Sequence, residues 1–360
     1  MKNCKRNSNI ELLRIVLMIF VITLHYNGMG GHALELYTSG LNFYFTRFTE
    51  ALGVCAVDCF VLISGFFLSY NRKIKVKKIL HILLVVIGLK FFDFLFQIFI
   101  DGNNFSLRHF VACFLPTNYY ATFYLVLYIL SPFVSKLFDS FKDKKQAALF
   151  IGILIFLFSL FPFCLEFANH ILGLNVGGMN TVNAFAGSES GYTIVNFMLL
   201  YCIGVFLSRY KISLKNIYSL TCYLLSLICI FILEFIDSES ALSYASPFVI
   251  LNAVCLFMLF SKISFSSKFI NYVSAATFGV FCLHTGNFLG TKWSLFEIPA
   301  LKNSRGGVLL NSLFVVFGMT AVCYGIDLVL RLLVSPLRKK LNETKLYKKE
   351  FVVDGCMEYN

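Results

Sequence analysis

Residues 10–26 read IELLRIVLMIFVITLHY, an apolar run long enough to span a membrane as one helix. Two side chains, Arg14 and His25, are polar exceptions within it. A charged residue at the centre of a membrane helix costs roughly 2.5–3.5 kcal/mol on insertion scales. Ionisable residues inside spans are therefore functional candidates by default.

The spacing of these two residues predicts where their side chains lie. Eleven helical steps of about 100° come to about three turns, so Arg14 and His25 share one face of a helix. They lie about 16 Å apart along its axis. We expect a fixed cation near one membrane surface and a titratable imidazole near the other.

The composition extends this interpretation to the whole chain. Of 360 residues, 58% are hydrophobic and 14% are charged, against roughly 45–50% and 25% in a soluble domain. Apolar runs of about twenty residues recur from end to end. The sequence predicts an all-α polytopic membrane protein with about ten transmembrane helices. The predicted spans are 10–26, 49–70, 79–100, 119–138, 147–166, 192–208, 217–236, 246–261, 272–291 and 307–334.

The net charge of +12 follows the predicted topology. Lysines and arginines gather at the N-terminus, in alternate loops and in the C-terminal tail, which is typical of cytoplasmic segments. We therefore expect both termini in the cytoplasm and no nucleic-acid partner. The expected organisation is one transmembrane domain, 1–345, followed by a cytoplasmic tail, 346–360.

Other sequence features point less strongly to function. The twelve cysteines lie mostly in apolar runs; Cys55 and Cys59 are four apart, but no second pair or histidine stands at zinc-ligand spacing, so no metal site is predicted. The segment 168–190 is rich in Gly, Asn and Ser, which suits either a hydroxyl-rich ligand or a flexible connector.

Each candidate residue also has a structural interpretation. Arg14 either binds an anion through its guanidinium or snorkels to lipid phosphate. His25 is either a general base or an interfacial histidine bonded to water or a backbone carbonyl. Asp58, in the second span, carries a functional carboxylate, bonds to a neighbouring helix or is protonated. Ser64 and Gly65 form a small-residue step where either helices pack closely or the helix bends, and the sequence favours packing.

Two motifs carry a family resemblance. The R-x10-H pattern of Arg14 and His25, followed by AVDCFVLISGFFL at 56–68, resembles the acyltransferase family 3 membrane proteins. The second motif is similar to the family signature G-V-D-x-F-F-V-x-S-G-F/Y-L, with Ala56 in place of the glycine. FYLVLYILSPF at 123–133 and FGVFCLH at 278–284 resemble later family elements more loosely.

The resemblance implies a membrane O-acyltransferase in the plasma (inner) membrane. It would move an acyl group, usually acetyl, from cytoplasmic acetyl-CoA to a hydroxyl of an extracytoplasmic or lipid-linked glycan. His25 and Asp58 are the expected catalytic residues, with Asp58 orienting an imidazole or a polar neighbour. The family often has paired arginines after the second span, where this chain has one arginine followed by lysines. The expected CoA-binding cations are Arg14, Arg72, Lys73 and Lys75, and the expected acceptor-side residues are Tyr124 and His284.

Two other functions remain open from the sequence. A transporter or flippase for a lipid-linked saccharide also needs polar residues within its spans, although no internal repeat is evident. A membrane scaffold or sensor is the third alternative, but it leaves the alignment of Arg14 and His25 unexplained. The expected partners are acyl-CoA, a glycan and membrane lipids, and a homo-oligomer is compatible with the sequence.

Overall fold

The structure is a computed structural model that describes residues 7–115, 118–173, 191–286 and 288–353. These residues are mostly helical, and the described part contains only two short strands. Seven helices are long and apolar enough to cross a membrane. The protein is thus an all-α membrane protein, as predicted.

Each of the ten predicted spans overlaps at least one helix of the described residues. Three of these segments are shorter than the seven long ones, namely Ile194–Arg209, Pro247–Ser261 and Lys268–Leu283. The number of spans that cross the bilayer and the side on which the termini lie stay predictions.

The chain divides into two compact units. Unit 1 comprises residues 1–53, 75–125 and 264–350, and unit 2 comprises 54–74, 126–263 and 351–360. These units do not test the predicted division of the chain into a transmembrane domain, 1–345, and a tail, 346–360, which stays a prediction.

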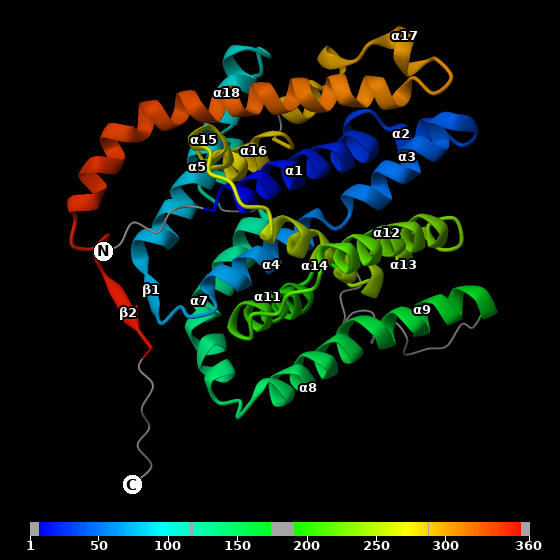
Figure 1. Ribbon diagram of the computed structural model, residues 1–360. Helices are drawn as coiled ribbons and strands as arrows, with labels where there is room; N and C mark the ends of the chain where they lie inside the picture. The colour runs from blue at the N-terminus through cyan, green and yellow to red at the C-terminus, as the bar shows by residue number, and fades with distance from the viewer. Residues whose placement is uncertain (1–6, 116–117, 174–190, 287, 354–360) are drawn as a thin grey trace. The chain divides into compact units, whose positions relative to one another are not determined.

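Unit 1 is built around the first helix, α1, which is drawn in dark blue in Figure 1. Its elements are α1 (Ser8–His25), η1 (Tyr26–Gly30), α2 (Ala33–Leu36), α3 (Gly40–Gly53), α5 (Val76–Phe99), α6 (Leu107–Ala112), α15 (Lys268–Ser274), α16 (Thr277–Leu283), η3 (Leu289–Thr291), η4 (Trp293–Phe296), α17 (Pro299–Lys302) and α18 (Val308–Glu343).

An apolar stripe on α1 explains its central place in unit 1. Leu13, Leu17 and Val21 are four residues apart and almost completely buried, because this spacing puts them on one helix face. Around them α1 packs against α3, α15, α16 and α18 (Figure 1).

Hydrogen bonds attach the beginning of α1 to the segment around α15. The backbone N–H of Ser267 donates to Ser8 Oγ over 2.9 Å. The hydroxyl of Ser274 donates to the buried carboxylate of Glu11. The position of α1 against α15 is therefore fixed by polar contacts as well as by apolar packing.

Unit 2 contains the second motif. Its elements are α4 (Ala56–Leu68), α8 (Lys144–Ile155), η2 (Phe156–Leu160), α9 (Phe161–Leu172), α11 (Ile194–Arg209), α12 (Asn216–Leu233), α13 (Ser238–Ala241) and α14 (Pro247–Ser261). Three elements contribute residues to both units, namely α7 (Tyr119–Asp139), β1 (Lys73–Lys75) and β2 (Glu350–Val352), and the two strands pair.

Helices α4 and α11 approach each other closely through two glycines. A Cβ added to Gly65 would lie 2.1 Å from the carbonyl oxygen of Tyr201, and one added to Gly204 would lie 2.2 Å from that of Leu62. Larger residues would separate these backbones. The prediction that the small-residue step at Gly65 serves helix packing is confirmed.

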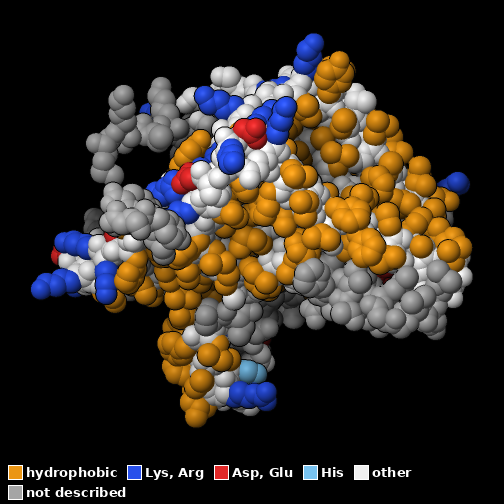
Figure 2. All heavy atoms as spheres, turned by 90° about the horizontal axis from the view of Figure 1, so that it is seen from below, with side chains coloured by type: hydrophobic (Ala, Val, Ile, Leu, Met, Phe, Trp, Pro, Cys, Tyr) orange, Lys and Arg blue, Asp and Glu red, His pale blue; other side chains and the backbone are white. Residues whose placement is uncertain are grey.

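The surface of the molecule is largely apolar. Figure 2 shows hydrophobic side chains over most of one face, with Lys and Arg in a few separate groups. On α12, Leu225 and Ile228 point outward, as Leu313 and Phe314 do on α18. Exposed apolar area of this extent is expected where a protein contacts lipid rather than water. Residues 174–190, most of the polar segment considered above, lie outside the described residues.

Candidate active site

In unit 1 the side chains of His25 and His284 contact each other. His25 is the last residue of α1, and His284 directly follows α16. Nε2 of His284 lies 3.0 Å from Nδ1 of His25. The packing of α1 against α16 thus joins two residues that are 259 positions apart in the chain.

The hydrogen-bond partners of the two rings define their tautomers. Nδ1 of His284 lies 3.0 Å from the carbonyl oxygen of Val280, which can only accept, so this nitrogen carries the proton. Nε2 of a neutral His284 then accepts from Nδ1–H of His25, which also lies 2.9 Å from the carbonyl of Val21. Nε2 of His25 is left with an available lone pair, as a general base requires.

The two rings differ in their exposure. His284 is completely buried, whereas His25 is partly exposed. The ring of Trp293 packs edge-on against His284 with centroids 6.5 Å apart. His284 therefore contacts His25 from the protein interior, and His25 is the more exposed of the two rings.

Arg14 lies on the same continuous α-helix as His25. The predicted helical geometry therefore applies, with the two side chains on one face and about 16 Å apart along the axis. The Arg14 guanidinium is about one-third exposed and lies 3.5 Å from the carboxylate of Glu11. The sequence analysis did not single out Glu11, although its three-residue spacing from Arg14 is typical of helix ion pairs.

Tyr124 packs into a small apolar cluster of unit 1. The cluster is formed by Ile82, Val86 and Ala121, with Cys282 of α16 packed against it. The Nζ atom of Lys78 lies 5.1 Å from the centre of the Tyr124 ring, a cation–π distance. The structure thus brings Tyr124 close to α16, and its role toward an acceptor stays a prediction.

Asp58 is a buried carboxylate on α4 of unit 2. It is fully inaccessible to solvent, and among the described residues neither oxygen has a hydrogen-bond partner. Cys55 lies three residues before Asp58, about one helical turn, and Cys59 is the next residue in the chain. Described contacts therefore do not identify the group that Asp58 would orient, and this role stays a prediction.

The cations predicted to bind CoA are engaged to different degrees. Arg72 forms an ion pair with Asp139. Lys73 and Lys75 are exposed on β1, and Lys75 lies 3.6 Å from Glu350 on β2. Arg72 therefore already contacts a carboxylate, and the exposed Lys73 and Lys75 remain accessible to an anion.

The sequence analysis missed a second arginine at Asp139. Arg209 lies 2.5 Å from this carboxylate and donates to the carbonyl oxygens of Ser69 and Ser135 over 2.7–2.9 Å. Two guanidinium groups thus share one carboxylate and leave a net positive charge. No sequence spacing indicated this cluster, because Arg72, Asp139 and Arg209 come from three separate segments.

An ion pair within a single helix is easier to recognise from the sequence, because it depends on spacing alone. Asp327 and Arg331, four residues apart on α18, form an ion pair of 2.5 Å. This is the structural role expected of charged residues at that spacing in a span.

The fold and the site define an all-α membrane protein that carries an imidazole pair at the end of its first helix. The family described as "Acyltransferase domain" matches residues 7–328, nearly the whole chain. The protein therefore belongs to acyltransferase family 3 and is a membrane acyltransferase. No curated protein and no solved structure gives a significant match to the chain.

Proposed function

We propose that the protein is an O-acyltransferase that moves an acetyl group from cytoplasmic acetyl-CoA to a hydroxyl of an extracytoplasmic or lipid-linked polysaccharide. The observation that carries the proposal is the hydrogen bond between His25 and His284, which leaves Nε2 of His25 with its lone pair available. The family membership supports acyl transfer as the reaction type.

In the proposed reaction His25 acts as the general base. Its Nε2 takes the proton of an acceptor hydroxyl as the hydroxyl oxygen attacks the thioester carbonyl carbon. The carbon–sulfur bond breaks, and the proton on His25 passes to the departing thiolate. The products are an O-acetyl ester and free CoA. An acyl-histidine intermediate is an alternative route with the same overall balance.

His284 acts in this reaction as a positioning residue. Its Nε2 accepts from Nδ1–H of His25 and keeps the proton on that nitrogen. When Nε2 of His25 takes up a proton, the imidazolium donates more strongly to His284, since hydrogen bonds from charged donors are about twice as strong as neutral ones. The arrangement therefore favours proton uptake during the attack.

Arg14 is the residue that would bind the acyl donor in the proposed reaction. A guanidinium binds phosphate in a bidentate manner, and the acyl group of acyl-CoA is carried on a long and nearly neutral arm. Anchored at Arg14, this arm would reach toward His25 without moving the nucleotide across the membrane. Arg14→Lys keeps the charge but removes the fork, so we expect the KM for acetyl-CoA to rise about three- to tenfold.

The proposal includes a topology of ten spans with both termini in the cytoplasm, in the plasma (inner) membrane. This orientation puts Arg14 toward the cytoplasm and His25 toward the outer surface. Lys73 and Lys75 would then lie on the cytoplasmic side, where they can attract the CoA phosphates.

Comparison of the surface glycans of cells with and without the chain tests the proposed function. We expect an alkali-labile acetyl ester, identified by mass spectrometry, to disappear in the deletion strain and to return on complementation. Unchanged ester content together with loss of glycan export would instead support the transporter alternative.

A further inference from the structure

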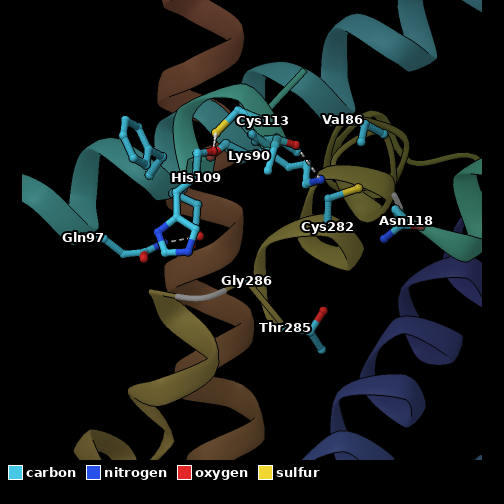
Figure 3. Close-up of a pocket in the computed structure, with 13 residues that line it drawn as sticks. Val86, Lys90, Gln97, His109, Cys113, Asn118, Cys282, Thr285 and Gly286 are labelled. Carbon is cyan, nitrogen blue, oxygen red and sulfur yellow. Dashed lines mark hydrogen bonds between the residues drawn. The ribbon is translucent and has the colours of Figure 1, made fainter. Parts of the chain in front are cut away.

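A pocket in unit 1 lies beside the residues around His284. It is formed by α5, α6, the region before α7 and the end of α16, and its volume is about 370 Å³ (Figure 3). Cys282 precedes His284 in the wall of this pocket, and Thr285 and Gly286 follow it. One wall of the pocket and His284 are thus built on one short segment of chain.

The wall formed by this segment is anchored to α5. Asp93 Oδ1 accepts from the backbone N–H of Phe288 over 2.9 Å, and Gln97 donates to Asp93 Oδ2 over 3.0 Å. A Cβ at Gly286 would lie 2.6 Å from Asp93 Oδ1, so only glycine allows this approach. Gly286 and Phe288, which follow His284, are therefore held against Asp93 of α5.

A second anchor holds the side of the pocket formed by α6. Lys90 Nζ donates to the carbonyl oxygens of Ala112 and Leu115 over 3.2 and 2.8 Å at the end of this helix. Cys113 donates to the carbonyl of Lys90 over 3.6 Å, and burial raises the pKa of its thiol. Cys113 is therefore suited to a structural role and not to that of a nucleophile.

Other polar groups of the pocket remain available. Among the described residues, the Thr285 hydroxyl, the Asn118 Nδ2 and the His109 ring have no hydrogen-bond partner. These groups donate and accept hydrogen bonds, and the lining also includes apolar side chains such as Val86 and Leu89 (Figure 3). A sugar ring combines hydroxyl groups that donate and accept with apolar C–H faces, so it matches this lining.

The size of the pocket agrees with a ligand of this kind. Its volume falls at the lower end of the range of roughly 300–1,000 Å³ that small-molecule sites span. We propose that the pocket binds a neutral sugar ring of the acceptor through hydrogen bonds from Thr285 and Asn118, beside the segment that carries His284. This inference rests on the proposed acyltransferase function.

A kinetic experiment tests the assignment. The full-length chain in membranes is supplied with acetyl-CoA and a panel of neutral methyl glycosides, and the release of the CoA thiol is measured against glycoside concentration. Thr285→Val removes a hydroxyl without changing its shape. Asn118→Asp removes the amide donor but keeps the oxygen that accepts from the N–H of Ala121 at the beginning of α7.

We expect each variant to raise the KM for the glycoside about three- to tenfold, the usual effect of losing one neutral hydrogen bond. The KM for acetyl-CoA should stay the same. Thr320→Val is the matched control, because its hydroxyl bonds to Val316 of its own helix. A changed KM for acetyl-CoA with an unchanged KM for the glycoside would overturn the assignment and place the donor in the pocket.

The proposed function and the pocket fail in different ways. If no glycoside accelerates thiol release by the unchanged chain, the proposed function is wrong, and the pocket assignment falls with it. If glycosides accelerate release and both variants keep the KM of the unchanged chain, only the pocket assignment is wrong.

Discussion

Units 1 and 2 each bury an ionisable side chain of a family motif among apolar helices, but these two side chains are bonded differently. In unit 1 the buried His284 has a partner at each ring nitrogen, one of which is His25. In unit 2 the equally buried Asp58 has no hydrogen-bond partner among the described residues.

The difference indicates which unit holds an ionisable side chain in a fixed orientation before a substrate binds. A ring held by two hydrogen bonds has a defined orientation and tautomer, which is what a reacting group needs. An ionised carboxylate without partners in an apolar interior is costly. Unit 1 is therefore expected to respond to substitution in its reaction rate, and unit 2 mainly in its packing.

The largest expected effect is that of His25→Ala. Loss of a general base lowers rates by about 10²- to 10⁴-fold, so thiol release from acetyl-CoA in the presence of acceptor should fall by this factor. His170→Ala, which changes an exposed histidine of α9, is the control and should keep full activity. If His25→Ala kept more than a tenth of the activity of the unchanged chain, His25 would not be the general base and the contrast between the two units would fail.

His284→Phe should have the next largest effect. Phenylalanine keeps a buried ring but cannot accept from His25, so we expect kcat to fall about 10- to 100-fold, the equivalent of one buried hydrogen bond. The carbonyl of Val280 still accepts the backbone N–H of residue 284. The KM for acetyl-CoA should change little.

His284→Gln separates positioning from packing. Its side-chain oxygen can accept from Nδ1–H of His25, so it should recover part of the lost kcat although it packs less well than phenylalanine. Equal activity of the two variants would mean that His284 contributes only its volume.

Gly65→Ala tests the packing of unit 2. The added methyl group would lie 2.1 Å from the carbonyl of Tyr201, so α4 and α11 must move apart. We expect a loss of about 1–3 kcal/mol in stability, seen as a lower midpoint of thermal unfolding in detergent. Gly88→Ala is the control, since nothing lies within 4 Å of its added Cβ.

Asp58→Asn should have the smallest effect. Asparagine has the same shape and avoids a buried charge, and it can still orient a neighbour by hydrogen bonding. We expect thiol release within about threefold of the unchanged chain and an equal or higher unfolding midpoint. An inactive but folded Asp58→Asn protein would show that the carboxylate takes part as a charge, and the contrast between the units would be lost.

The helices could be predicted from the sequence because apolar length is a local property. The run 10–26 anticipated α1, and the run 49–70 anticipated a helical region that the structure divides into α3 and α4 around Val54 and Cys55. This division and the π-helical turn η2 had no clear sequence signal. They depend on the neighbouring helices more than on propensity.

The candidate site could be predicted in part. The relation of Arg14 to His25 follows from helical periodicity alone. The contact of His25 with His284 depends on how α1 and α16 pack, and no spacing within one helix encodes it. The sequence named His284 as an acceptor-side residue, and only its position in the fold indicates that it supports His25.

The attachment of α1 at both ends limits which acyl donors could be used in the proposed reaction. Ser267 and Ser274 bond to the first turns of α1, and His284 bonds to its last residue. The helix can neither slide nor rotate against this segment without breaking these contacts, so the span from Arg14 to His25 is rigid. In the proposed reaction this fixed distance would select the length of the acyl donor. A donor with a shortened arm would bind at Arg14, but its acyl group would not reach His25.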